Sequence, residues 1–212
     1  MYTPSEFLVA IAEHLSPARR PAGFPALLVT LMRELVKGCP VPKEALAKAL
    51  GWTVERVAAV LDEVPSTEYD DQGRVLGYGV TLRETQHAFE VDGQRLYTWC
   101  AFDTLMFPAV IDKTARVASR CPHTGERILL TVAPDEIRSL EPPGAVLSLL
   151  MPDATADIRR YFCCHVHFFA SASAGKIWSA RHPGSATVSV GEAFLLGHTI
   201  ACGLLEGAAI PS

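Results

Sequence analysis

The stretch TVERVAAVLDEVPSTEYDDQGRVLGYGV, residues 53–80, joins a short amphipathic helix to a hairpin. Thr53 is a favourable N-cap residue, and the valines and Leu61 that follow it recur at helical spacing. Residues 68–80 contain the sequence Asp-Asp-Gln-Gly at 70–73, a glycine-containing turn between two strand-like segments. The stretch therefore predicts a helix over 54–64 followed by a β-hairpin.

Two further helices are expected upstream of this stretch. Residues 25–36 are apolar at helical spacing and end at Gly38, and residues 43–50 form a shorter helix that Gly51 stops. Three helices followed by a hairpin are the element order of a winged helix-turn-helix. Residues 1–80 are therefore predicted to form a winged-helix-like module.

Residues 81–212 predict a second domain of mixed secondary structure. Strand-like segments occupy residues 88–91, 115–119, 128–132, 145–150 and 161–170, with turn signals between several of them. Helices are expected over 95–107, ending before Pro108, and over 190–204, which opens with Ser189 and Glu192 at capping-box spacing. The fold class predicted is α+β, a helical module followed by a mostly antiparallel sheet with packed helices.

Composition excludes several classes of protein. The chain has 212 residues, of which 49% are hydrophobic and 20% charged, as in ordinary globular proteins. The net charge of −4 does not attract nucleic acid or an anionic membrane. The N-terminus does not resemble a signal peptide, and no apolar run is long enough for a membrane helix. A cytoplasmic location is expected.

The six cysteines are candidates for reactive or buried thiols rather than disulfides. They are Cys39, Cys100, Cys121, Cys163, Cys164 and Cys202. A reducing compartment disfavours disulfides, and no CxxC pair is present to suggest a zinc ribbon or a thioredoxin-like site. Cys121 is expected in a hairpin turn, while Cys39 and Cys202 have no charged neighbour that would activate them. These three cysteines are interpreted as structural.

The predicted helix over 95–107 carries an unusual carboxylate. At helical spacing, Leu96, Trp99, Cys100, Asp103 and Phe107 fall on one stripe. An aspartate on an apolar stripe costs several kcal/mol unless it is paired or protonated. The stripe is compatible with a structural aspartate beside a passive cysteine, and also with a reactive pair formed by Cys100 and Asp103.

A second candidate segment is YFCCHVHFF, residues 161–169. If it is a strand, Cys163, His165 and His167 share one face and Cys164 points the other way. The polar face makes Cys163 the better partner for Cys100, with Cys164 a small buried hydrophobe. The same face could bind zinc, although neither a second cysteine pair nor a helical histidine pair accompanies it.

Long strings of this sequence resemble the organomercurial lyase (alkylmercury lyase) family. The densest similarity covers residues 56–64, 66–70, 77–79, 82–85, 97–108 and 162–171. The family's two catalytic cysteines fall on Cys100 and Cys163, and its catalytic aspartate falls on Asp103. Some members carry serine at the aspartate position. This sequence has Asp103 there, so the usual acid is present. The N-terminus and the tail after Leu205 match least.

The resemblance implies protonolysis of a carbon–mercury bond. Two thiolates, the preferred protein ligands of a soft metal, would hold mercury while Asp103 moves a proton from thiol to carbon. No organic cofactor is implied. The Hg(II) product, held by Cys100 and Cys163 with Asp103 beside it, would pass to cytosolic thiols or to a mercuric reductase. The oligomeric state, the range of organic groups, the first-attacking thiol and any role of His165 and His167 stay open.

Two other functions are compatible with parts of the sequence. A winged-helix regulator could sense metal through Cys163 and the histidines, but residues 1–80 hold ten acidic against eight basic residues. The third helix is itself acidic, which disfavours contact with DNA phosphates. A metal buffer without catalysis would keep the cysteines and not need Asp103. The prediction is a catalytic domain over 81–212 and an N-terminal module that does not bind nucleic acid.

Overall fold

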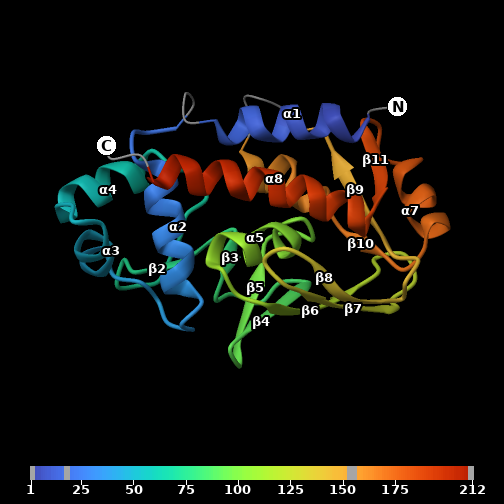
Figure 1. Cartoon of the computed structure of the whole chain (residues 1–212), viewed down its shortest axis with the longest axis horizontal. Helices are drawn as coiled ribbons and strands as arrows, with labels where there is room; N and C mark the ends of the chain where they lie inside the picture. Colours follow the sequence, from blue (N-terminus) through green and yellow to red (C-terminus); the bar gives the residue numbers. More distant parts are fainter. Residues whose placement is uncertain (1–2, 17–19, 152–156, 210–212) are drawn as a thin grey trace.

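The computed structural model describes residues 3–16, 20–151 and 157–209. Its first part is helical, and Figure 1 shows α2 rising between α3, α4 and the rest of the molecule. Thr53 caps α4 by accepting a hydrogen bond from the Arg56 amide, as the sequence predicts. The four helices are α1 (Pro4–Leu15), α2 (Phe24–Leu35), α3 (Lys43–Leu50) and α4 (Val54–Asp62).

The main sheet is antiparallel and contains the predicted hairpin. Its strand order is β1-β2-β3-β5-β4-β6-β7-β8. The strands are β1 (Glu68–Tyr69), β2 (Val75–Tyr78), β3 (Val80–Thr81), β4 (His87–Val91), β5 (Gln94–Thr98), β6 (Ala115–Arg120), β7 (Arg127–Val132) and β8 (Ile137–Glu141). Because β3 joins β2 to β5, the hairpin of the N-terminal module continues directly into this sheet.

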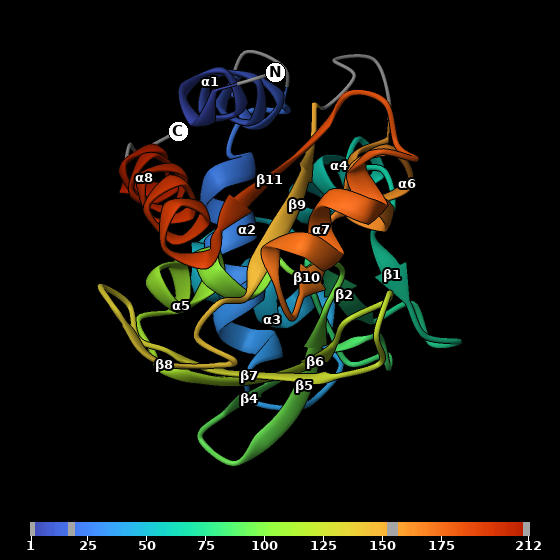
Figure 2. The same cartoon turned by 90° about the vertical axis from the view of Figure 1, so that its right-hand side faces the viewer.

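A smaller sheet lies beside the main one. It consists of β9 (Val146–Leu150) between β10 (Phe168–Phe169) and β11 (Ser185–Ser189), and α7 (Ala172–Ser179) packs on it. Figure 2 shows α7 in front of these strands and the main sheet curving below them. The sequence indicated β9, whereas α7, β8 and β11 were not predicted.

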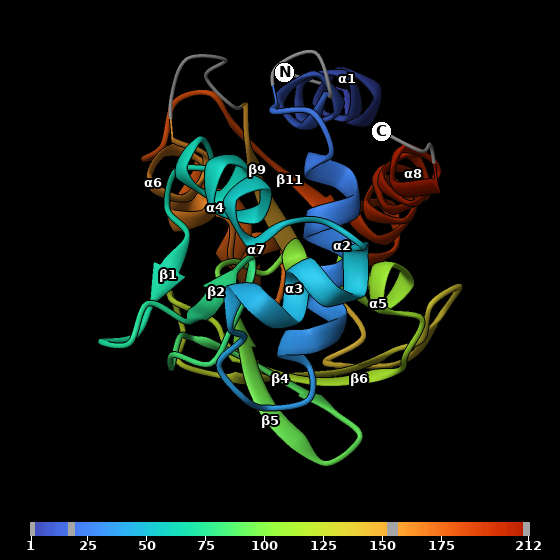
Figure 3. The same ribbon diagram turned by 90° about the vertical axis from the view of Figure 1, so that its left-hand side faces the viewer.

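A long C-terminal helix covers the core between the sheets and the N-terminal helices. This helix, α8 (Val190–Ala209), contacts α1, α2 and α5 (Asp103–Ile111), and Figure 3 shows it beside α1 and α5, on the far side of α2 from α4. Ser189 and Glu192 form the predicted capping box at its start. The α+β class and the mostly antiparallel sheet predicted from the sequence are confirmed.

The predicted helix over 95–107 is wrong. Residues 94–98 form β5, which pairs with β4 through the turn at Asp92 and Gly93, and α5 begins only at Asp103. The aromatic and β-branched residues before Cys100 suit a strand once β4 lies beside them. Helix α5 then continues past Pro108 despite the hydrogen bond lost there, since Phe107 before the proline and Val110 and Ile111 after it are buried.

The strand predicted over 161–170 is also wrong. Asp157 caps a one-turn helix, α6 (Ile158–Tyr161), and a 3₁₀ turn, η2 (Cys163–His165), follows it. Only Phe168 and Phe169 are strand residues. The side-chain oxygen of Asp157 offers the Arg159 amide a local partner, which favours a helical turn over extension.

Candidate active site

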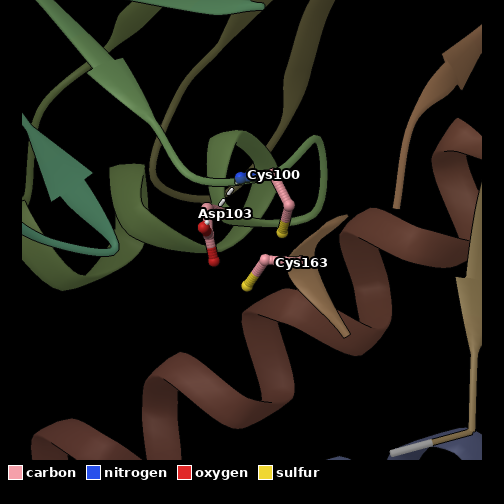
Figure 4. Close-up of side chains that lie close together, drawn as sticks. All are labelled: Cys100, Asp103 and Cys163. Atoms are coloured by element: carbon pink, nitrogen blue, oxygen red, sulfur yellow. Dashed lines mark hydrogen bonds between the residues drawn. The ribbon is translucent and has the colours of Figure 1, made fainter. Parts of the chain in front are cut away.

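Cys100, Asp103 and Cys163 converge on one buried point. One ligand atom from each lies within 4.8 Å of the others, and Figure 4 shows the two thiols and the carboxyl group facing one another. Cys100 is 0%, Cys163 5% and Asp103 7% exposed. They are the only group of three or more such ligands found in the described part of the chain. The three candidates named from the sequence therefore lie together.

Cys100 lies in the turn between β5 and α5, and Asp103 is the first residue of α5. The Cys100 backbone N–H donates a hydrogen bond of 3.2 Å to Asp103 Oδ2 (Figure 4). The Thr98 hydroxyl donates to the Cys100 carbonyl at 2.9 Å, and the Thr104 hydroxyl donates to the Ala101 carbonyl at 2.7 Å. These local bonds fix the turn and direct the carboxyl group toward the thiols.

The Cys163 segment is attached to this turn from the other side of the site. The Ala101 amide donates to the Val166 carbonyl at 3.2 Å, and the Phe102 and Phe162 rings meet edge to face. Arg159, in the helix just before Cys163, stacks its guanidinium 4.6 Å from the Trp99 ring centre. Both cysteine segments are thus held by contacts between residues distant in the sequence.

Cys163 and Cys164 differ in burial. Cys163 is buried and Cys164 is exposed. The sequence selected the same cysteine by strand alternation, but that reason is wrong because the segment is a 3₁₀ turn. Successive residues of a helical turn also point in different directions, so only one of the two thiols enters the site. Cys164 is not the small buried hydrophobe that alternation predicted.

His165 and His167 do not join the cysteines. His165 lies against His182, while the His167 ring contacts those of Trp178 and His87. The shared face of Cys163 and these histidines, which was the alternative zinc-binding interpretation, does not form, because the strand that would create it is absent.

The remaining cysteines lie outside the site. Cys121 is buried at the β6–β7 turn, as predicted, and Cys39 is exposed. Cys202 was expected to lack a basic neighbour, yet its sulfur lies 3.8 Å from Nδ1 of His198, one helical turn away.

Burial raises the pKa values of all three site residues. It raises the pKa of Asp103 to about 7, against the hydrogen bonds from Cys100 that lower it. Burial, together with Cys163 and Asp103, raises the pKa of the Cys100 thiol well above its ordinary value. For Cys163, the hydrogen bond from Cys100 lowers the pKa, but burial and the Asp103 charge outweigh it. The site therefore favours neutral thiols, and its carboxyl group exchanges protons near neutral pH.

A cavity of about 40 Å³ borders Asp103 and Cys163. Its walls are mostly apolar and come from α1, α2, α5, α6 and α8, with Tyr78 and Trp99 also exposed to it. Gly79 lets the Phe107 ring approach closely, since a Cβ there would lie 2.5 Å from it and the residue has φ of +74°. Tyr78 was not among the site residues predicted from the sequence, although it lies between two glycines at 77–79.

The fold and the site define a class of protein: an α+β protein with a buried two-thiol, one-carboxyl site suited to a soft metal. The family described as alkylmercury lyase matches residues 80–202, and the helix-turn-helix domain of alkylmercury lyase matches residues 6–79. The chain belongs to the alkylmercury lyase family.

Curated relatives extend this similarity over most of the chain. An alkylmercury lyase of Pseudomonas putida is 60% identical over 92% of this chain and 92% of its own. One of Staphylococcus epidermidis is 52% identical over 79% of this chain and 77% of its own. A solved structure, the mercury-bound form of MerB2, aligns with a TM-score of 0.78 over 94% of this chain and 99% of its own. At 22% identity, that last match supports the fold alone.

Proposed function

We propose that this chain cleaves the carbon–mercury bond of organomercurials, with Cys100 and Cys163 as mercury ligands and Asp103 as the proton shuttle. The observation that carries the proposal is the convergence of two thiols and one carboxyl group within 4.8 Å in a buried site. Thiolates are the preferred protein ligands of soft metals. A carboxyl group beside them supplies the acid that cleavage of a metal–carbon bond requires.

The first steps load mercury onto the thiols. One thiol displaces the inorganic ligand of the organomercurial as its sulfur bonds to mercury, and its proton leaves with that ligand. The second thiol then bonds to mercury and gives its proton to the Asp103 carboxylate. Coordination to a metal strongly favours loss of a thiol proton, which offsets the raised pKa values of both cysteines.

The last step breaks the carbon–mercury bond. Two thiolates on mercury raise the electron density of that bond and make its carbon more basic. The Asp103 carboxyl group gives its proton to the carbon, which keeps the bonding electron pair and leaves as a hydrocarbon. Mercury stays in the +2 state on Cys100 and Cys163. A pKa of about 7 suits Asp103 to both halves of this transfer.

The product then leaves by thiol exchange. Hg(II) on two thiolates would pass to small thiols of the cell or to a mercuric reductase, because a competing thiol can replace each sulfur in turn. No step of this sequence requires an organic cofactor.

The N-terminal module has a role in the site rather than on DNA. Leu28, Met32 and Tyr78 line the cavity beside Asp103, so residues 1–80 contribute a wall to it. Glu55 and Asp62 of α4, and Glu63 directly after it, are exposed, which presents acidic rather than basic groups at the surface of this helix. The described residues contain no helix long and apolar enough to cross a membrane.

Release of hydrocarbon tests the proposal directly. The purified protein, incubated with phenylmercury acetate and excess small thiol, should release benzene, measured by headspace gas chromatography. A metal buffer would bind mercury at the same thiols without releasing benzene. Absence of benzene from a folded protein that binds mercury stoichiometrically would overturn the proposal.

A further inference from the structure

Two side chains that line the cavity carry hydrogen-bond donors with no partner among the residues that the structure describes. They are the Tyr78 hydroxyl and the Trp99 indole N–H, on side chains that are 6% and 9% exposed. Buried polar groups are almost always paired, and an unpaired one in a native structure calls for an explanation. Two such donors in one cavity point to an acceptor that occupies it.

Aromatic packing holds both donors in place. The Tyr78 ring meets Trp99 edge to face at 5.0 Å and Phe24 at 5.9 Å. The Arg159 guanidinium lies over Trp99, 4.6 Å from the centre of its ring. Rings packed in this way cannot turn their polar atoms toward solvent without breaking these contacts. The donors therefore have to find their acceptor inside the cavity.

The hydroxyl of Tyr78 is a donor at neutral pH. Burial raises the pKa of Tyr78 to about 12; the positive charge of Arg20 opposes this shift, and the negative charges of Cys163 and Asp103 add to it. The Arg20 guanidinium lies 5.1 Å from the ring centre of Phe24, the residue that packs on Tyr78. A hydroxyl that keeps its proton can donate a hydrogen bond to an acceptor in the cavity.

The cavity itself limits what the acceptor can be. Apart from Tyr78, Trp99, Asp103 and Cys163, its described lining side chains are hydrocarbon or thioether groups. A volume of about 40 Å³ is enough for a water molecule, which needs roughly 10–15 Å³. The acceptor is therefore an oxygen atom, carried either by water or by the organic group of the substrate.

We propose that Tyr78 determines substrate specificity: its hydroxyl, with the Trp99 N–H beside it, binds an oxygen acceptor next to the mercury site. This inference rests on the proposed carbon–mercury cleavage. A purely hydrocarbon group must displace water from the two donors and leave them unpaired, whereas a group that carries a carboxylate can replace that water. Oxygen-bearing organic groups are thus favoured over hydrocarbon groups of the same size.

Tyr78→Phe tests this role because it removes the hydroxyl and keeps the ring. The kcat and KM for phenylmercury are compared with those for 4-carboxyphenylmercury, in the wild type and the variant. Tyr69→Phe, which removes the hydroxyl of a half-buried tyrosine that does not line the cavity, is the matched control. In Tyr78→Phe the preference for the carboxylated substrate should fall about tenfold or more, the effect of one buried donor.

The two sources of oxygen give different results. If the substrate supplies it, KM for the carboxylated compound rises and KM for phenylmercury stays or falls. If water supplies it, both KM values fall together and the preference for the carboxylated compound does not change, which would overturn the role of Tyr78 in specificity. Unchanged KM values, or a joint rise in KM with a fall in kcat, would overturn the inference and reduce Tyr78 to a packing residue. A wild type that releases no benzene would instead contradict the proposed function.

Discussion

Replacing Asp103 with Asn should separate mercury binding from cleavage. The asparagine keeps the shape of the side chain and an oxygen that accepts the Cys100 N–H, but it cannot take up and deliver a proton. Cys100 and Cys163 remain to bind mercury. General acid catalysis is typically worth about 10²–10⁴-fold, so single-turnover cleavage should slow by that factor.

The same substitution should stabilise the fold at neutral pH. Burial raises the pKa of Asp103 from 3.8 to about 7, which corresponds to a cost of about 4 kcal/mol for the ionised form in the folded state. Because the folded pKa is the higher one, the folded state binds more protons, and stability is lost as pH rises from about 4 to 7. Asn carries no charge and avoids that loss. The gain should be near zero at pH 4 and at most about 4 kcal/mol at pH 8.

Two measurements on Asp103→Asn test this reasoning. Urea unfolding at pH 4, 6 and 8 gives the pH dependence of stability, and single-turnover benzene release gives the rate of cleavage. Asp71→Asn, at an exposed position of the β1–β2 turn, is the control that should change neither. Cleavage at the wild-type rate with normal mercury binding would show that another acid supplies the proton. A variant no more stable than wild type at pH 8 would contradict the burial cost.

Four further outcomes are expected. Cys100→Ser and Cys163→Ser should abolish benzene release, whereas Cys164→Ser should retain most of it, because Cys164 is exposed and outside the site; an inactive, folded Cys164→Ser beside an active Cys163→Ser would reverse that assignment. Activity should survive dialysis against a chelator, and elemental analysis should find no stoichiometric zinc; loss of activity together with one zinc per chain would refute this. In an anisotropy titration, duplex DNA should bind to this protein no more tightly than to an acidic control protein. A steep salt-dependent affinity would revive the regulator hypothesis. Burial lowers the pKa of His87 to about 3, so the unfolded state binds the extra proton and stability falls as pH drops below 6.5; urea unfolding of His87→Gln should show less of that fall, by about 2–3 kcal/mol at pH 4.5, and an equal fall in both proteins would refute the assignment.

Local sequence signals predicted the parts of the fold that local interactions decide. The three helices predicted for the N-terminal module, the hairpin at 68–80 and the capping box at Ser189 all formed, whereas α1 was not predicted. So did most of the antiparallel strands that short turns connect. In each case the deciding contacts lie within a few residues of one another, so a short window of sequence contains them.

The two segments that carry the site were assigned the wrong secondary structure. Residues 95–98 fit a helical stripe in isolation, and only pairing with β4 makes them a strand. The segment around Cys163 reads as a strand until Asp157 caps a helix before it. Propensity is weak where a short segment fits two patterns, and tertiary contacts then decide.

The sequence by itself determined the chemistry available to this protein: a carboxylate among apolar residues, the cysteines that can hold a soft metal, and the strings shared with one family. Only the tertiary structure decided how that chemistry is assembled. It placed Cys100 in a turn against a 3₁₀ turn carrying Cys163, left Cys164 exposed, and brought Tyr78 to the wall of the adjoining cavity. The physical reason is that burial and proximity depend on residues far apart in the chain. A shift of the Asp103 pKa to about 7 therefore arises only once the surrounding helices and strands have closed over it.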